Sequence, residues 1–354
     1  MTMPRVKFLL VALVLVILLC ASSGCTTHEQ NQDKTVLKVV PAGSLLQPFD
    51  DVEKAFETQH PDVDVQVEGH GSIQAIRQVT DLHRPIDVVA VADASLIPDL
   101  MYRKDSMTGS NFTDSYVPFA TNAMVIAYTN KSRYADKITP ENWGEVLSRP
   151  DVRVGFSNPM LDAAGYRSIM VTLLADRYYH NTTLFSVIIG SHFIPPLVAE
   201  NEGGIVTVRL PEVLRPSDEK LVIRDGSIFV LSQLEAGGID YAFEYQSVAE
   251  GHDLRWISLP PEIDLSSPDN ADKYGQVRVM LGFQRFSTIG QDRTGQPIVY
   301  AITIPNSAPH RELAREFADF VVGMAKTGGK GWPSPLTELV AQIITQEVWE
   351  IWST

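Results

Sequence analysis

Two glycine–serine pairs in this chain lie where backbone and hydroxyl groups could hold an anion. Gly43-Ser44 follows an apolar strand predicted over 36–40, and Gly71-Ser72 follows an alternating strand predicted over 63–67. Apolar residues at helical spacing come next in both places, so each pair stands at the start of a predicted helix. Glycine lets the backbone approach a ligand, serine offers a hydroxyl, and the first N–H groups of a helix lack partners. The two pairs therefore indicate an anion site at the carboxyl ends of successive strands, whereas N-capping explains either pair taken alone.

The elements that would position these pairs alternate between strands and helices, which is typical of a parallel sheet covered on both faces. Further strands are predicted over 86–91, 152–156, 239–245 and 298–304. Helices are predicted after 165, over 227–236, from 313 and over 336–352. The length of the chain is enough for two domains.

Two stretches bear on how such domains would be connected. Residues 117–128 read as one long extended segment that could cross between domains, and the strand over 298–304 could return the chain to the first domain. Residues 260–294 hold Pro, Gly and Asp punctuation and are predicted to be mostly irregular.

The N-terminus has the pattern of an export signal. Arg5 and Lys7 precede an unbroken apolar run over 8–19, and small residues lead to Cys25. We therefore expect a signal peptide over 1–24, lipidation at Cys25 and a flexible tether over 25–35, which would hold the protein at the outer face of the cell membrane. An uncleaved membrane anchor with an incidental cysteine is the alternative.

Composition excludes several classes of function. The formal charge is −14, and it becomes −16 without residues 1–24, which carry two basic and no acidic residues. Nucleic-acid binding requires clustered basic residues, so no nucleic-acid partner is expected. No cysteine follows Cys25, so the exported part has neither disulfides nor a thiolate metal site. The scattered histidines show no metal-ligand spacing, and no cofactor is expected.

Several segments, in order along the chain, resemble the archaeal-type molybdate/tungstate-binding proteins that supply ABC importers. The resemblance extends from about Val36 to Phe320. The segments that carry it are Ala42-Gly43-Ser44-Leu45, Gly71-Ser72, Asp87-Val88-Val89-Ala90 with Ala92-Asp93, Asn142-Trp143, Arg149-Pro150-Asp151-Val152, Gly165-Tyr166-Arg167 and Asp240-Tyr241-Ala242-Phe243-Glu244-Tyr245-Gln246-Ser247-Val248-Ala249.

The resemblance implies an α/β, two-lobed type II periplasmic-binding fold, in which two crossing strands join the lobes and a cleft lies between them. We expect the first lobe to contain 36–120 and 299–354, and the second to contain 121–298. By motif position, Asp162 and Glu244 would complete a six-coordinate metal centre together with four oxo ligands. Ser44 and Ser72 would donate hydrogen bonds to the oxo groups, with Tyr245 as a further donor. The chain departs from the family around Asp162, at Met160-Leu161 and Ala163-Ala164.

A pair of carboxylates in the cleft would discriminate among anions. A carboxylate ~4 Å from a dianion is repelled by about 8 kcal/mol at an effective dielectric constant near 20. Sulfate cannot expand its coordination, whereas molybdenum(VI) and tungsten(VI) accept two more oxygen donors. The alternative is that Asp162 supports the helix that follows it and that neither carboxylate faces the cleft. That alternative has to explain the charge of Glu244 within an apolar strand.

The expected function is capture of tungstate or molybdate by lobe closure and delivery to an ABC permease, by a monomer that carries out no covalent chemistry. A receptor of the same fold for sulfate, phosphate or another small anion is the first alternative. A secreted hydrolase is the second, although the chain has no Gly-x-Ser-x-Gly elbow and no cysteine nucleophile after Cys25. A structural or adhesive surface protein would show repeats, and none is evident.

Overall fold

The computed structural model describes residues 34–282 and 292–336. From Val36 onward the chain forms one compact unit. The predicted signal peptide, Cys25, the tether up to residue 33 and the predicted helix beyond 336 lie outside the described residues. Within 34–282 and 292–336, no helix has the length and apolar character needed to cross a membrane.

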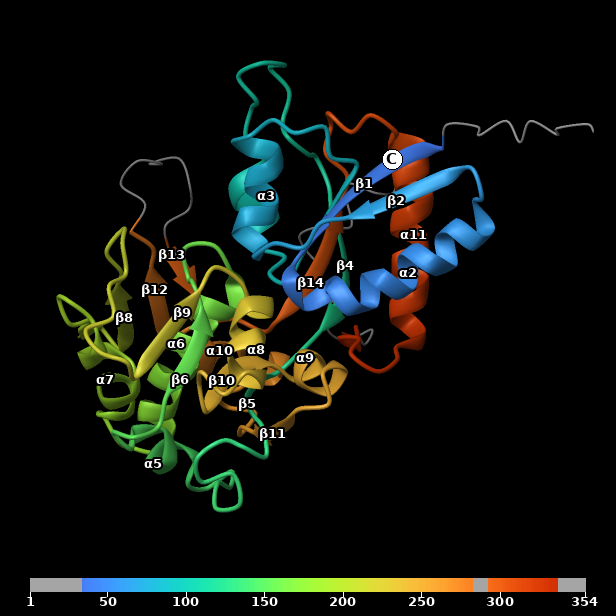
Figure 1. Ribbon diagram of the computed structural model, residues 1–354. Coiled ribbons are helices and arrows are strands. Elements are labelled where there is room, and N and C mark those ends of the chain that lie inside the picture. The colour runs from blue at the N-terminus through green and yellow to red at the C-terminus, as the bar shows by residue number, and fades with distance from the viewer. Residues whose placement is uncertain (1–33, 283–291, 337–354) are drawn as a thin grey trace, which may run out of the picture. The chain divides into compact units, whose positions relative to one another are not determined.

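The first lobe is built on a six-stranded sheet with the order β15-β4-β14-β3-β1-β2 (Figure 1). Helix α2 packs against α11, α3 packs against α4, and Figure 1 shows the two pairs on either side of the strands. The strands are β1 (Thr35–Pro41), β2 (Val63–Val67), β3 (Val88–Val91), β4 (Val117–Thr121), β14 (Val299–Thr303) and β15 (Ser334–Pro335). The helices are η1 (Gly43–Leu45), α2 (Leu46–Gln59), α3 (Ser72–Thr80), α4 (Leu96–Met101) and α11 (Arg311–Thr327).

This sheet is mixed, although the alternation of strands and helices predicted a parallel one. Strands β1 and β3 are parallel, as predicted, but β14 is antiparallel to both β3 and β4. The reason is that β14 does not follow a crossover helix from β3. It enters from the second lobe at residue 299 and inserts between β3 and β4, so its direction is free of the rule for strand–helix–strand units.

The second lobe contains a five-stranded sheet with the order β11-β5-β10-β6-β9 and a four-stranded sheet with the order β13-β12-β8-β7. Its strands are β5 (Met124–Tyr128), β6 (Val154–Ser157), β7 (Ala199–Glu202), β8 (Ile205–Arg209), β9 (Leu221–Arg224), β10 (Tyr241–Tyr245), β11 (Arg255–Ser258), β12 (Val277–Met280) and β13 (Asp292–Thr294). Its helices are α5 (Trp143–Ser148), α6 (Ala163–Tyr178), α7 (Leu184–Ile188), η2 (Gly190–His192), α8 (Ser227–Glu235), α9 (Gln246–Gly251), η3 (Pro268–Asn270) and α10 (Ala271–Tyr274).

Two connections join the sheets of the two lobes, from β4 to β5 and from β13 to β14. The segment predicted as one extended run over 117–128 is two strands in different sheets, separated by Asn122 and Ala123. The side chain of Asn122 explains the break, because its Oδ1 accepts from the N–H groups of Ala123 and Ser247 at 3.0 and 3.3 Å. The segment 260–294, predicted to be mostly irregular, contains the short elements α10, β12 and β13 that the prediction did not include, and its residues 283–291 lie outside the described residues.

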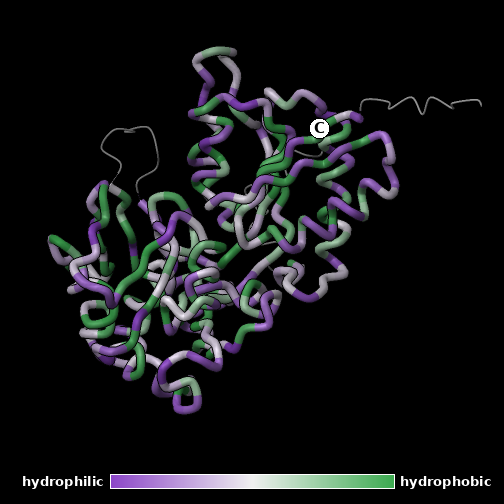
Figure 2. The backbone as a smooth tube through the Cα atoms, viewed as in Figure 1, coloured by the Kyte–Doolittle hydropathy of each residue, from purple (hydrophilic) through white to green (hydrophobic). Residues whose placement is uncertain are grey.

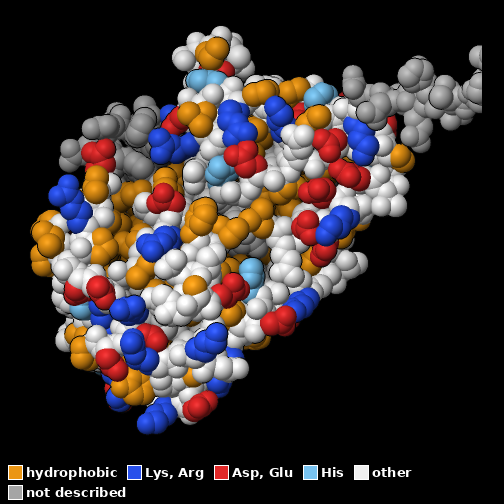
Figure 3. Space-filling model, in the orientation of Figure 1, with side chains coloured by type: hydrophobic (Ala, Val, Ile, Leu, Met, Phe, Trp, Pro, Cys, Tyr) orange, Lys and Arg blue, Asp and Glu red, His pale blue; other side chains and the backbone are white. Residues whose placement is uncertain are grey.

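The core follows the apolar runs of the central strands, which Figure 2 shows as hydrophobic segments inside the molecule. Strands β3, β5, β6, β10 and β14 are buried along their whole length. On the outer face drawn in Figure 3, acidic and basic side chains are interspersed. A carboxylate in a fully buried strand such as β10 is therefore an exception that requires a partner or a function.

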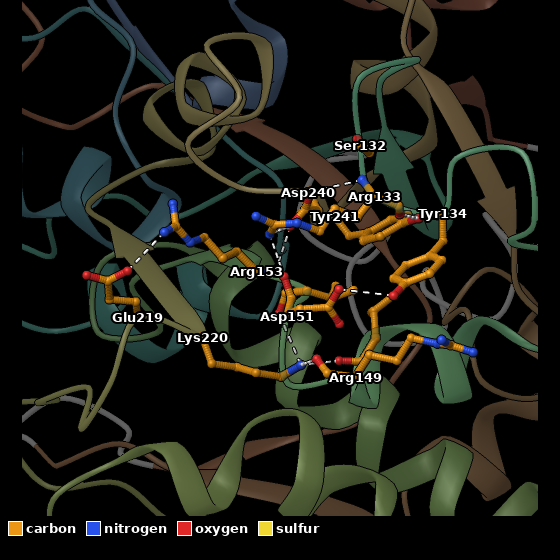
Figure 4. Close-up of polar contacts among 12 residues, drawn as sticks. Ser132, Arg133, Tyr134, Arg149, Asp151, Arg153, Glu219, Lys220, Asp240 and Tyr241 are labelled. Atoms are coloured by element: carbon orange, nitrogen blue, oxygen red, sulfur yellow. Dashed lines mark hydrogen bonds and ion pairs between the residues drawn. The ribbon is translucent and has the colours of Figure 1, made fainter.

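A polar network fixes the start of β10 and the strands beside it (Figure 4). The carboxylate of Asp240 accepts from the backbone N–H groups of Arg133 and Arg153, both at 2.9 Å, and from the Arg133 guanidinium at 3.0 Å. The Lys220 ammonium donates to the carbonyls of Arg149 at 2.6 Å and Val152 at 3.1 Å. These bonds hold the base of the sheet whose opposite end carries Glu244.

Candidate anion-binding site

Asp162 and Glu244 meet at one residue, Ser227, the first residue of α8. The Ser227 backbone N–H donates to Asp162 Oδ2 at 3.1 Å, and the Ser227 hydroxyl donates to Glu244 Oε2. The two carboxylates come from different elements, since Asp162 precedes α6 and Glu244 lies in β10. Their exposed fractions are only 3% and 1%. The structure therefore brings together the two carboxylates expected from the sequence.

Asp162 is the N-cap of α6, which explains its position. Its Oδ1 accepts from the backbone N–H of Ala164 at 3.3 Å, so the carboxylate satisfies one free donor of the helix. Burial raises the pKa of Asp162, although the donors on it act in the opposite direction. Helix support was expected from the sequence as an alternative to ligand binding for Asp162, and the structure shows that this residue does cap α6. Capping occupies one oxygen and leaves Oδ2 turned to Ser227.

Glu244 is the more perturbed of the two acids. Its pKa is raised to about 8, chiefly by burial and to a smaller degree by the nearby carboxylate of Asp162, while the donors from Ser227 and the backbone of Tyr245 partly oppose the rise. The Tyr245 N–H donates to Glu244 Oε1 at 2.9 Å. The site thus holds an acid that ionises reluctantly until something neutralises its charge.

The predicted donors Ser44 and Ser72 are buried in the first lobe, and each accepts a hydrogen bond from the protein. Ser72 Oγ accepts from the N–H of Ala92 at 3.0 Å, and Ser44 Oγ accepts from the hydroxyl of Tyr300 at 3.0 Å. The Tyr300 oxygen in turn accepts from the Asn122 side chain at 3.2 Å. Because these bonds use the serine oxygens as acceptors, each hydroxyl proton remains available for an oxyanion.

The N–H groups at the start of α3 differ from the expectation of free donors. Those of Ile73 and Gln74 both donate to the carbonyl of Leu161, at 3.0 and 3.1 Å. The contact joins the two lobes and requires glycine at position 71, because a Cβ there would lie 2.4 Å from that carbonyl oxygen and 2.8 Å from Asp162 Cβ. The close approach of the Gly71 backbone places the Gly71-Ser72 pair beside Asp162.

Tyr245, the remaining expected donor, is fully buried at the boundary between the second lobe, to which it belongs, and the first lobe, which contains Ser44 and Ser72. Its hydroxyl oxygen accepts from Arg167 Nη1 at 2.8 Å, and its ring packs edge-on against Tyr300 with centroids 5.8 Å apart. As with the serines, this bond uses the oxygen as an acceptor and leaves the proton free to donate. A cavity of about 580 Å³ opens between the lobes and reaches Ser44 from solvent, past Ile228 and His252.

Sequence reasoning missed Ser227 and Tyr300. A signal for Ser227 was present, because Gly226-Ser227 is a further glycine–serine pair at the start of a helix, and it begins two residues after the end of strand β9. Tyr300 carries no local signal, since it reads as one apolar residue in a buried strand. In the described parts of the chain no three His, Cys, Asp or Glu side chains gather to hold a metal cation. The arrangement is thus two acids and several hydroxyl donors, which suits an oxyanion with an acceptor centre.

The fold and this site define a solute receptor, and comparison with known proteins gives its family. The chain belongs to the family of bacterial extracellular solute-binding proteins, whose model matches residues 37–327. Members of this family are exported receptors rather than enzymes, which confirms the expectations of export and of a binding function.

Named relatives cover most of the chain. The molybdate/tungstate-binding protein WtpA of Thermococcus kodakarensis is 40% identical over 334 residues, which cover 91% of this chain and 88% of that protein. WtpA of Pyrococcus abyssi is 40% identical over 326 residues, covering 89% and 88%. An uncharacterized solute-binding protein of Methanoculleus marisnigri is 41% identical over 312 residues, covering 85% and 84%. The resemblance recognised in the sequence is confirmed.

Solved structures confirm the fold class. The periplasmic molybdate-binding protein of Azotobacter vinelandii superposes with a TM-score of 0.50 at 17% identity, covering 83% of this chain and 94% of that one. The sulfate-binding protein SubI of Mycobacterium tuberculosis superposes with a TM-score of 0.51 at 14% identity, covering 88% and 91%. The chain therefore has the two-lobed type II periplasmic-binding fold, as expected.

Proposed function

We propose that this protein captures tungstate or molybdate between its lobes and delivers the anion to an ABC permease. The observation that carries the proposal is the pair of buried carboxylates, Asp162 and Glu244, held by the two donors of Ser227. Two relatives about 40% identical to the chain are named for the same anions. One oxygen from each carboxylate would complete six-coordination around the metal centre, and Ser44, Ser72 and Tyr245 would donate to its oxo groups.

The carboxylate pair favours this ligand class over sulfate or phosphate. An anion that cannot accept oxygen donors would meet two buried acids and be repelled, by about 4 kcal/mol for each pair of unit charges at ~4 Å and an effective dielectric constant near 20. Tungsten(VI) and molybdenum(VI) convert the same contacts into bonds. The ligand-site residues that the sequence nominated are thus also those that would select the ligand.

The lobes and the attachment to the cell belong to the same proposal. The sheets support a first lobe of residues 36–120 and 299–336 and a second lobe of 121–298, since the six-stranded sheet draws on the first set with one residue beyond it at each of two strand ends, Thr35 in β1 and Thr121 in β4. We place residues 337–354, which lie outside the described residues, in the first lobe as well. We further propose that the receptor acts as a monomer and that a lipid on Cys25 tethers it to the outer face of the membrane. Mass spectrometry of the purified protein should show a diacylglycerol-type mass increase on a peptide that begins at Cys25.

Calorimetric titration tests the ligand. The full-length protein, purified in detergent, should bind tungstate or molybdate tightly and give no heat with sulfate or phosphate. Asp162→Ala and Glu244→Ala should each abolish the signal, whereas Glu250→Ala, which removes an exposed acid on the neighbouring α9, should bind normally. Sulfate or phosphate binding that survives both site substitutions would discard the metal-coordination mechanism and leave an anion receptor of the same fold.

A further inference from the structure

Arg167 is a buried cation that reaches from one lobe into the other. It lies in the second turn of α6, and its side chain is almost fully buried. Its Nη1 donates to the carbonyl of Ala92 at 2.7 Å, and its Nη2 lies 3.4 Å from Asp93 Oδ2. Both of these partners follow β3 in the first lobe, so the guanidinium ties the two lobes together close to the carboxylate pair.

Hydrogen bonds from Ser95, in the same lobe, fix the side chain of Asp93 for this contact. Its Oδ1 accepts from the N–H of Ser95 at 3.1 Å and from the Ser95 hydroxyl at 2.8 Å. Its Oδ2 receives Arg167 and also the hydroxyl of Tyr166, at 2.5 Å. Asp93 is 3% exposed, so its charge has little water around it and depends on protein partners. Burial raises the pKa of Asp93, but the charge of Arg167 and then that of Arg293 lower it below its ordinary value, and Gln296 also donates to Oδ1 at 3.2 Å. A buried acid that loses its cation is strongly disfavoured.

The same guanidinium also holds a ligand-site donor. Its Nη1 donates to the hydroxyl of Tyr245 at 2.8 Å, within the second lobe. Tyr245 directly follows Glu244, and its N–H donates to that carboxylate. One Arg167 nitrogen thus touches the first lobe through Ala92 and the anion site through Tyr245. Separation of the lobes would remove two of the three partners of Arg167 and loosen the third.

We propose that Arg167 is a positioning residue that couples lobe closure to the orientation of Tyr245, so that the bound oxyanion is released slowly. The inference rests on the proposed function, because it assigns Arg167 a role at that same site. The contacts of the Arg167 guanidinium are with protein groups, namely Ala92, Asp93 and Tyr245. When the lobes close, Arg167 binds Ala92 and Asp93 of the first lobe and at the same time holds the Tyr245 hydroxyl in its correct direction.

Stopped-flow binding of tungstate to the full-length protein tests this proposal. Arg167→Lys keeps the charge but offers a single nitrogen, which cannot serve Ala92, Asp93 and Tyr245 in the guanidinium's planar geometry. We expect its dissociation rate to rise at least tenfold while the association rate stays within twofold of wild type. Asp93→Asn, which acts from the opposite lobe, should do the same, and it keeps the test open if Arg167→Lys fails to fold.

The matched control is Arg133→Lys. Arg133 forms an ion pair of 3.0 Å with Asp240, but both residues belong to the second lobe (Figure 4). Its dissociation rate should stay within twofold of wild type. Arg167→Lys is also made in a Tyr245→Phe variant. There it should raise the dissociation rate clearly less than it does in the wild type, whereas an arginine with a purely structural role would raise it equally in both.

Each outcome has a distinct meaning. Wild-type dissociation rates in folded Arg167→Lys and Asp93→Asn would overturn the inference while leaving the tungstate receptor intact. Equal losses from Arg167→Lys with and without the Tyr245 hydroxyl would also overturn it, because the arginine would then act independently of that donor. If the wild-type protein binds neither tungstate nor molybdate, the proposed function itself fails.

Discussion

Tungstate binding should release close to one proton at pH 7, and the proton should come from Glu244. Burial raises the pKa of this acid to about 8 from an ordinary 4.5, with Asp162 adding to the effect. At pH 7, one unit below that pKa, about nine-tenths of the Glu244 side chains are protonated. A carboxylate that becomes a metal ligand must lose its proton. Release should therefore be about 0.9 proton at pH 7 and about 0.1 at pH 9.

The same shift sets the pH dependence of affinity. Affinity should rise by about ninefold from pH 6 to 7 and by about fivefold from pH 7 to 8, because each unit of pH removes part of the cost of ionising Glu244, and it should level off above pH 8. The rise in the pKa of Glu244 from 4.5 to about 8 corresponds to about 5 kcal/mol, which coordination of the metal centre has to offset.

Calorimetry in two buffers of different ionisation enthalpy measures the proton directly, since the apparent heat changes in proportion to the protons released. Glu250→Gln is the matched control and should release the same amount as wild type. Tight tungstate binding at pH 7 without proton release would refute the reasoning. It would mean that Glu244 either ionises before binding or stays neutral and donates a hydrogen bond to an oxo group.

Three further predictions concern the same site. Because the folded-state pKa of Glu244 lies above its unfolded value, the folded protein holds the extra proton and its stability falls as pH rises from 4.5 to about 8. Glu244→Gln should therefore melt above ligand-free wild type at pH 8.5 and close to it at pH 5, and equal melting at both pH values would contradict the perturbed pKa. Ser227→Ala removes the hydroxyl that donates to Glu244 and should weaken tungstate binding by about tenfold or more, because a hydrogen bond to a charged group contributes roughly 1.5–3 kcal/mol. Ser232→Ala, on the outer face of the same helix, is the control and should have no effect in the same titration. Gly71→Ala should abolish tungstate binding without unfolding the protein, because the added Cβ would lie 2.4 Å from the Leu161 carbonyl oxygen and hold the lobes apart. Retained affinity would show that binding does not need the close approach of Gly71 to Leu161. Gly323→Ala is the control, since in the described part of the chain nothing beyond its own helix would lie within 4 Å of the added Cβ.

The strands and helices that the sequence predicted well are those whose burial is continuous or periodic. The apolar run at 299–303 and the amphipathic spacing over 311–327 are both where they were expected. The failures have a common cause in tertiary context. The short strands β12 and β13 complete a small sheet with β8, and the alternation in β12 covers only four residues, which is too short to predict a strand before that partner is in place.

For the site, the glycine–serine pairs were predicted from local chemistry, whereas Asp162, Glu244 and Tyr245 came from the resemblance to a known family. In the structure, Ser227 links Asp162 with Glu244, and the N–H of Tyr245 donates to Glu244. Ser44 and Ser72 bond instead to Tyr300 and Ala92. What could not be foreseen was which residues would join them. Tyr300 returns from the far end of the chain to reach Ser44, and this pairing exists only once β14 has inserted into the first sheet.

The bond between the Leu161 carbonyl and the start of α3 has a consequence for signalling. It satisfies two backbone donors of α3 that an empty, closed receptor would otherwise leave without partners, so closure without cargo is less costly than it would be in a cleft lined only by free donors. A transporter that sensed closure alone would then respond to empty receptors and spend ATP without import. The opposing influence is the pair of acids, whose unrelieved burial penalises the empty closed form. The accuracy of the signal therefore depends on the balance between one carbonyl and two carboxylates.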